Sequence, residues 1–132
     1  MEEVYEYLKR CGTFYLATAE GDQPHVRPFG VVDLFEGKLY IQTGNIKPVF
    51  AQMKKNPKIE ISGMADGGTW IRVTATAVQD DRMEARQHML DANPTLKSIG
   101  YAADDGNCEV LYLKDATAQF CSFTQPTRTV KF

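Results

Sequence analysis

The sequence predicts a mainly β domain with short helices, an antiparallel barrel of six or seven strands. Several short segments alternate apolar and polar residues or are rich in β-branched and aromatic residues, and turn residues separate them at hairpin spacing. Only brief stretches with helical periodicity lie between them. The chain has 132 residues, of which 43% are hydrophobic, so we expect one domain over residues 1–132 with a single core.

The first third of the chain predicts a short helix and three strands. Residues 2–10 have the periodicity of an amphipathic helix, and Gly12 ends it. Three β-rich segments follow, bounded by turn residues: 13–19, 24–32 and 38–43. Pro28 lies within the second segment, which indicates an edge position or a local break in the ladder. The hairpin spacing predicts that these three strands form an antiparallel meander.

The rest of the chain alternates helices with strands. Asn45 is the expected N-cap of a helix over residues 47–55, and Pro48 suits its first turn. Asp81 and Glu84 resemble a capping box that opens a helix to about Leu90. A shorter helix is expected from residue 93 to residue 100. Four further strands are expected, at 58–65, 69–79, 109–113 and 116–123.

The composition excludes several classes of function. Fifteen basic against seventeen acidic residues give a net charge of −2, which does not favour nucleic-acid binding. No apolar run approaches the roughly 20 residues of a membrane helix, so no membrane partner is expected. The first residues are acidic and do not resemble a signal peptide, which favours the cytoplasm.

Histidines and cysteines are too few and too scattered to suggest a metal site. Three cysteines are widely spaced, and we expect them to be small buried hydrophobes: Cys11, Cys108 and Cys121. His25 is expected on a strand surface and His88 in solvent. The sequence has no motif of a side-chain nucleophile or of a metallohydrolase, and catalytic side chains are not identifiable. If the protein is an enzyme, difficult chemistry would therefore depend on an organic cofactor.

One stretch combines basic residues with a junction between a strand and a helix. Arg27 precedes a proline within a strand, and Thr43, Asn45 and Lys47 lie where the next strand leads into a helix. Free backbone N–H groups and the helix dipole favour an anion there, above all a phosphate. The alternative is that Arg27 and Lys47 are solvated and Asn45 only caps the helix.

The single tryptophan, Trp70, shares the polar face of a strand with Arg72. A tryptophan in this position suits a flat ring or a subunit interface. The alternative is an ordinary residue of the core or of a sheet edge.

The order of these segments resembles the pyridoxamine 5′-phosphate oxidase-like family of FMN-binding split β-barrels. The similarity covers nearly the whole chain, and it rests on motifs in a fixed order: GTFYLAT from Gly12, QPHVRPFG from Gln23, LYIQT from Leu39, Lys47, QMKKNPKI from Gln52 and WIRV from Trp70. The resemblance implies an antiparallel split β-barrel of six to seven strands.

The resemblance also implies a cofactor site for FMN. The family's phosphate-holding arginine and lysine match Arg27 and Lys47, with Thr43 and Asn45 beside them. The backbone of Pro28, Phe29 and Gly30 is expected along the isoalloxazine edge, and Gln42 is at a family contact position. The family's homodimer has its flavin at the interface, so Trp70 and Arg72 are expected to serve the other subunit's flavin, and Phe123 is expected to approach it.

The resemblance implies an FMN-dependent oxidoreductase that acts on a small molecule of unknown identity. Two alternatives stay open: a non-catalytic protein that binds or senses flavin or haem, and a deazaflavin-dependent reductase. Oxidation of pyridoxamine phosphate is not expected, because the chain is shorter than the authentic oxidase and lacks its arginine-rich C-terminal segment. The split barrel also hosts nitroimidazole-resistance reductases, so the fold does not define the substrate.

Overall fold

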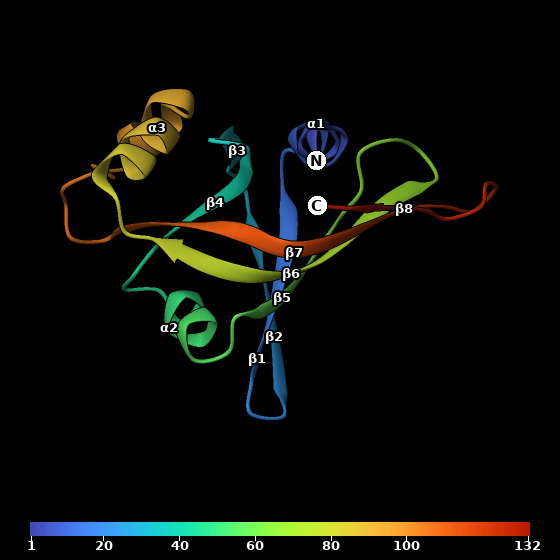
Figure 1. The fold of residues 1–132 in the computed structure, drawn as a ribbon, viewed down its shortest axis with the longest axis horizontal. Helices are drawn as coiled ribbons and strands as arrows, with labels where there is room; N and C mark the ends of the chain where they lie inside the picture. The colour runs from blue at the N-terminus through green and yellow to red at the C-terminus, as the bar shows by residue number, and fades with distance from the viewer.

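A computed structural model describes residues 1–132 as one strongly bent antiparallel sheet with four short helices around it (Figure 1). The elements follow in this order: α1 (Glu2–Cys11), β1 (Phe14–Glu20), β2 (Gln23–Phe29), β3 (Val32–Phe35), β4 (Lys38–Gly44), α2 (Pro48–Lys55), β5 (Lys58–Gly63), β6 (Thr69–Asp80), α3 (Met83–Ala92), α4 (Thr95–Ser98), β7 (Cys108–Ser122) and β8 (Arg128–Lys131).

The sheet is an open barrel whose two edge strands are consecutive in the chain. Its order is β2-β1-β5-β6-β7-β4-β3, with β8 paired to β7, and all pairings are antiparallel. The strands β2 and β3 are not paired with one another, although only Gly30 and Val31 separate them. The barrel is therefore split at this link, and the predicted fold class, a mainly β split barrel with short helices, is confirmed.

The two longest strands, β6 and β7, connect the halves of the sheet. One edge of β7 pairs with β6 along nearly its whole length, and the other edge pairs first with β4 and then with β8. The register of β6 against β7 shifts between Thr74 and Thr76, where Asp115 of β7 has a positive φ of 51°. An irregularity of this kind bends a strand and increases its twist, which curves the sheet into a barrel.

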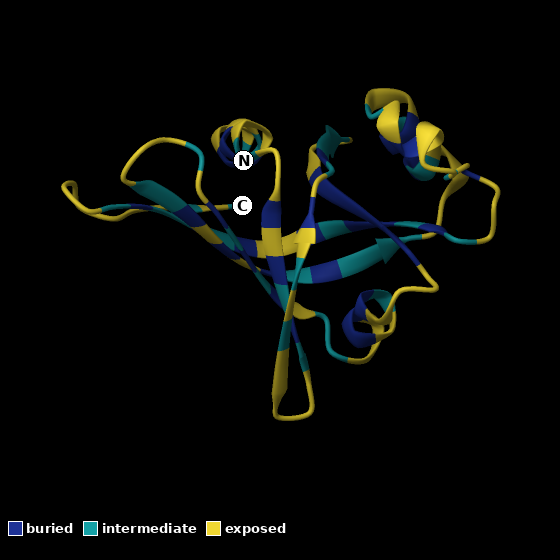
Figure 2. Cartoon of the chain, turned by 180° about the vertical axis from the view of Figure 1, so that it is seen from behind, coloured by how far each residue is buried: buried dark blue, intermediate teal, exposed yellow.

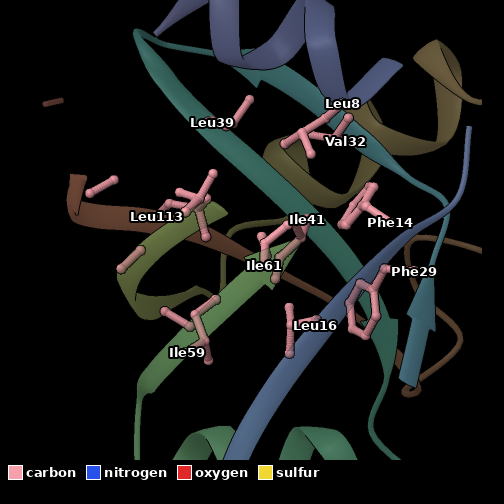
Figure 3. Close-up of a cluster of buried hydrophobic side chains, with 14 of the residues drawn as sticks. Leu8, Phe14, Leu16, Phe29, Val32, Leu39, Ile41, Ile59, Ile61 and Leu113 are labelled. Carbon is pink, nitrogen blue, oxygen red and sulfur yellow. The ribbon is translucent and has the colours of Figure 1, made fainter. Parts of the chain in front are cut away.

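The core fills the inside of the bend. Side chains from β1, β2, β3, β4, β5, β7 and α1 converge there, including Leu8, Phe14, Leu16, Phe29, Val32, Leu39, Ile41, Ile59, Ile61 and Leu113 (Figure 3). Alternate residues of β1 and β6 are buried, as expected of strands that cover a core with one face. The tip of the β1–β2 hairpin projects from the body of the molecule and is exposed (Figures 1 and 2).

The helices cover separate parts of the sheet. The helix α1 packs on β3 and α2 packs on β1, whereas α3 packs on β3 and β7. A second apolar cluster under α3 includes Tyr40, Ala85, Met89 and Val110. No helix is long and apolar enough to cross a membrane.

The strand pairing differs from the prediction in two places. The segment expected as one strand over residues 24–32 ends at Phe29, and Val32 begins β3, which pairs with β4. The expected meander is therefore wrong, because β2 and β4 are not neighbours. Near the C-terminus, β7 continues through Asp115 where a break was expected, and β8 was not predicted.

The helix caps also differ from the prediction. Lys47 stands at the N-cap of α2 and Arg82 at that of α3, and neither makes a side-chain cap hydrogen bond. Asn45 donates instead to the carbonyl of Gly106 (2.8 Å). The predicted Pro48 in the first turn of α2 is confirmed.

Candidate functional site

A cavity of about 240 Å³ lies at the split of the barrel. The end of β2 and the following link line one wall, the end of β4 and the start of α2 line another, and the region of α4 lines a third. The lining residues are Arg27, Pro28, Phe29, Gly30, Val31, Gln42, Thr43, Lys47, Val49, Leu96, Ile99 and Tyr101. Seven of the ten residues predicted from the sequence are thus brought together, and no acidic side chain is among the lining residues.

Arg27 faces the inside of the β1–β2 hairpin. It pairs with Leu16, which lies in the core, so both side chains are on the covered face of the sheet. The guanidinium donates to Oγ1 of Thr18 (2.8 Å) and, through its other terminal nitrogen, to Oε1 of Gln52 on α2 (2.6 Å). Thr18 itself donates to Gln52 (2.6 Å).

No carboxylate compensates the charge of Arg27. All its hydrogen bonds within the chain go to neutral acceptors: the Leu16 carbonyl, Thr18 and Gln52. Burial lowers the pKa of the guanidinium, but arginine stays protonated in proteins. A half-buried cation with only neutral partners is a natural site for an anion.

The end of β4 contributes a second group of polar residues. Thr43 and Gln42 are buried, and Nε2 of Gln42 donates to the carbonyl of Thr43 (2.9 Å). Lys47 is exposed, makes no ion pair within the chain and directly precedes α2. Arg27 and Lys47 therefore bring two uncompensated positive charges to one cavity.

The turn between β4 and α2 is held by the loop that precedes β7. The N–H of Asn45 donates to the backbone carbonyl of Asn107 (2.8 Å), and the N–H of Ile46 donates to the side-chain oxygen of Asn107 (3.2 Å). The Lys47 N–H bonds to Gly44 (3.1 Å). Most of the N–H groups that the sequence suggested for an anion are thus already paired. Val49 is the first helix residue with a free N–H, because Pro48 has none.

Asp105 holds this loop in shape. Its carboxylate accepts the N–H groups of Ala102 (3.0 Å), Asn107 (2.8 Å) and Cys108 (2.7 Å). The backbone bonds from Ala102 and Cys108 are the main reason that the pKa of Asp105 lies below its ordinary value. Asn45, predicted beside the phosphate, belongs to the same network and not to the cavity lining.

Five lining residues were not predicted as part of the site, and most are apolar: Val31, Val49, Leu96, Ile99 and Tyr101. Leu96 is buried against Leu90 and Ala103, and this small cluster attaches the region of α4 to the barrel. The sequence predicts a short helix here but carries no signal for its position, because its contacts are formed only in the folded barrel.

Trp70 and Arg72 lie on β6, away from the cavity. Trp70 packs against Phe123 with ring centroids 5.0 Å apart, and Phe123 is 78% exposed. Arg72 forms an ion pair with Glu60 across the sheet (3.1 Å). Neither side chain lines the cavity of its own chain, and the prediction that they serve a second subunit's cofactor stays a prediction.

Neither histidine lines the cavity. His25 lies on β2, half-buried, within 3.2 Å of Glu20. His88, expected in solvent, is half-buried and stacks on Phe35 at 4.6 Å, and its Nε2 is buried without a partner. The helix α3 folds onto the β3–β4 hairpin, which explains the difference. No group of three or more potential ligands could hold a metal ion, and the three cysteines are free.

The fold and the cavity together define a split-barrel protein with a basic site at the split. The family model described as pyridoxamine 5′-phosphate oxidase matches residues 1–119, and the chain belongs to this family. No curated protein matches the chain.

Solved structures extend the comparison. A NimC/NimA family protein from Clostridium acetobutylicum is 50% identical, with a TM-score of 0.96 over 100% of this chain and 92% of the other. A FAD-binding protein from Mesorhizobium loti is 17% identical, with a TM-score of 0.62 over 92% of this chain and 94% of the other. A heme binding protein from Mycobacterium smegmatis is also 17% identical, with a TM-score of 0.67 over 95% and 57%. The last two similarities concern the fold.

Proposed function

We propose that the protein binds FMN at the split of the barrel and is an oxidoreductase that acts on a small molecule. The observation that carries the proposal is the pairing of two uncompensated cations, Arg27 and Lys47, with an apolar wall in one cavity. A ligand that suits this arrangement has an anionic end and a flat apolar end. The family membership and the FAD-binding neighbour support a flavin.

The phosphate of FMN suits the basic end of the cavity. A phosphate monoester has a charge of about −1.5 to −2 at neutral pH, which two cations match. Arg27 would offer its guanidinium and Lys47 its ammonium, while Thr43 and the free N–H of Val49 would donate hydrogen bonds. All four lie in the cavity lining.

The isoalloxazine suits the other end. Pro28 and Phe29 end β2, and Gly30 and Val31 link it to β3. Gly30 and Val31 belong to no strand, so their backbone polar groups are available to the edge of the ring. Phe29, Val31 and Ile99 supply apolar surface. The flavin would supply the electron transfer, and the chain would bind and orient it and exclude water.

A second copy of the chain would complete the site. The cavity of one chain, about 240 Å³, is below the roughly 300–1,000 Å³ that is usual for small-molecule sites. The exposed Phe123 packs on the half-buried Trp70, and together they form an aromatic surface suited to a partner. We propose a homodimer with FMN between the subunits.

The absorption spectrum of the purified protein and an FMN titration test cofactor binding. We expect flavin absorbance, or saturable FMN binding that raises the melting temperature. Anaerobic reduction by NADH or NADPH, followed by reoxidation with candidate acceptors, then tests the redox function. A flavin that binds but is never reduced would favour a carrier or sensor, and tighter binding of a deazaflavin than of FMN would favour a deazaflavin-dependent reductase.

No binding of FMN at saturating concentration would contradict the proposal. The haem alternative finds no support in the cavity, because neither histidine lines it.

A further inference from the structure

Gln52 of α2 is a buried residue whose amide oxygen accepts two hydrogen bonds. Its Oε1 accepts from Oγ1 of Thr18 (2.6 Å) and from Nη2 of Arg27 (2.6 Å). The other terminal nitrogen of Arg27, Nη1, donates to Thr18 (2.8 Å), so each of the three side chains contacts the other two. Arginine can only donate hydrogen bonds, so the atom of Gln52 that faces it is the amide oxygen and not the nitrogen.

This triangle of side chains joins two walls of the cavity. Gln52 lies on the buried face of α2 together with Val49, which lines the cavity, and Lys47 directly precedes this helix. Arg27 lines the cavity from β2. The contact between Gln52 and Arg27 therefore sets the position of the guanidinium relative to the helix that follows Lys47.

Part of the guanidinium of Arg27 is left without a partner. A guanidinium has five N–H groups, and this one makes three hydrogen bonds within the chain, to the Leu16 carbonyl, to Thr18 and to Gln52. Its Nε and the second N–H of Nη2 donate to no group of the chain. These donors remain for a ligand in the cavity that Arg27 lines.

Residue 52 is the position at which the charge of Arg27 could be cancelled, and it is neutral. A carboxylate at this distance from an arginine forms an ion pair, whereas an amide oxygen holds the guanidinium by a hydrogen bond and leaves its positive charge in place. Glutamine and glutamate have nearly the same size, so packing alone does not require the amide. The amide keeps Arg27 both oriented and uncompensated.

We propose that Gln52 is a positioning residue that makes the site selective for a phosphorylated flavin, because its neutral oxygen orients Arg27 and leaves the charge of Arg27 to the phosphate. This inference rests on the function proposed above. It adds a source of discrimination between FMN and riboflavin, which lacks the phosphate. Gln52 does not line the cavity and acts through Arg27.

The test measures the dissociation constants of FMN and of riboflavin for the full-length wild type and for Gln52→Glu by isothermal titration calorimetry. Gln52→Glu keeps an oxygen acceptor for Arg27 and Thr18 but pairs the guanidinium with a carboxylate. We expect its FMN dissociation constant to rise about tenfold or more, while riboflavin binding stays unchanged. A purely structural role of Gln52 predicts instead that FMN binding survives, because the acceptor is kept. Gln23→Glu, at the exposed start of β2, adds the same charge and is the control that leaves both affinities unchanged.

Gln52→Met gives a second test that introduces no charge. Methionine fills a similar space but offers the guanidinium only a weak acceptor. We expect a rise of about two- to tenfold in the FMN dissociation constant, as for the loss of one hydrogen bond, again with riboflavin binding unchanged. Circular dichroism establishes that each variant folds, and if Gln52→Glu does not fold, Gln52→Met decides by the same comparison of the two flavins.

Four outcomes are distinguishable. Wild-type FMN binding by the folded Gln52→Glu variant, or an equal loss for both flavins, would overturn the role of Gln52 and leave the proposed function in place. Equal affinities of the wild type for FMN and riboflavin would overturn the selectivity while flavin binding stands. A wild-type protein that binds neither flavin would overturn the proposed function and this inference together.

Discussion

Arg27 combines two roles that a single substitution can separate. Its guanidinium bridges Thr18 and Gln52 and so attaches α2 to the β1–β2 hairpin, and its charge is available to the cavity. Both acceptors are buried, so removal of the donor leaves polar atoms with fewer partners. The structural alternative from the sequence, a solvated arginine, does not describe this side chain.

We expect Arg27→Ala to weaken FMN binding by about ten- to a hundredfold, which corresponds to about 1.5–3 kcal/mol for a lost charge-assisted contact. Arg27→Lys should lose less, because it keeps the charge but not the planar fork that reaches both Thr18 and Gln52. Titration calorimetry measures the affinities. Arg10→Ala is the control, because Arg10 is an exposed arginine of α1 that pairs with Asp66. An Arg27→Ala protein that folds and binds FMN like the wild type would remove Arg27 from the site.

Gly44 has a steric role that predicts a stability change. Alanine at this position forces the Tyr101 hydroxyl and the Asn107 amide to move, since both lie within about 3 Å of the new methyl group. Overpacking of this kind costs about 1–3 kcal/mol, so Gly44→Ala should lower the melting temperature. Gly67→Ala is a matched control, because nothing lies within 4 Å of its Cβ and its φ is not positive. Equal melting temperatures for the two variants would refute the close packing at Gly44.

Single residues of the site were predictable where local sequence defines their position. Thr43 and Lys47 flank a strand-to-helix junction, and Arg27 precedes a proline, so their motifs are visible in the sequence. Asn45 was assigned to a cap because the residue type and spacing suit one, but the loop at Gly106 and Asn107 competes for its amide. Tyr101 carries no local signal, because only the folding of α4 onto the barrel brings its hydroxyl to Gly44.

At the scale of elements, the junction of β6 with α3 depends on Asp80. Its carboxylate accepts from the Tyr40 hydroxyl (2.7 Å) and from Arg82, which also binds Glu36. The hydrogen bond from Arg82 is the main cause that lowers the pKa of Asp80 to about 2. Burial is the main cause that raises the pKa of Tyr40 to about 12. One carboxylate therefore ties β4, β6 and the start of α3 together.

This network predicts a defined acid sensitivity. Because the pKa of Asp80 is depressed in the folded state, its contribution to stability is complete above the unfolded pKa of 3.8 and is lost as the pH falls towards about 2. A shift of this size corresponds to about 2 kcal/mol. Asp80→Asn should lower the free energy of unfolding at pH 7, and its difference from the wild type should shrink between pH 4 and pH 2. Urea unfolding at several pH values measures this difference, and a constant difference would contradict the role of the charge.

Elements were easier to predict than their pairing. The periodicity of α1, β5 and β6 is local and gave the correct elements, and alternate residues of β6 are buried as expected. The β1–β2 and β3–β4 pairings are local hairpins, but the break at Gly30 and Val31, which leaves β2 paired with β1 alone, depends on barrel closure, which hairpin spacing does not encode. The continuity of β7 through Asp115 also depends on tertiary context, because Asp115 lies between the part of β7 that pairs with β4 and the part that pairs with β8.

For the whole molecule, the split explains why a site exists where it does. The predicted meander cannot bring Arg27 and Thr43 together, because β2 and β4 are not neighbours in the sheet. The structure brings both to one cavity because β2 and β3, although consecutive, end at opposite edges of the sheet. The opening between the edges leaves backbone and side chains of β2 and β4 facing a cavity, and the region of α4 closes its third side. The predicted strand pairing was thus wrong, while the roles of the cavity residues in binding a cofactor stay predictions.

The whole-molecule proposal of a dimer has its own test. Phe123 is 78% exposed beside Trp70, so a charge there should change the stability of one folded chain little, by about 0.5 kcal/mol or less. If this aromatic surface contacts a second copy, Phe123→Asp buries an unpaired charge in the interface and should shift the protein from dimer to monomer. Sedimentation velocity over a range of concentrations measures this shift.

FMN binding should weaken in parallel, because in the proposed dimer the second subunit completes the site. Met83→Asp on α3, also at an exposed apolar residue, is the control and should leave the assembly unchanged. A wild-type protein that is monomeric at all concentrations and still binds FMN would show that one chain holds the flavin alone. A dimer that survives Phe123→Asp would instead place the interface on another face of the barrel.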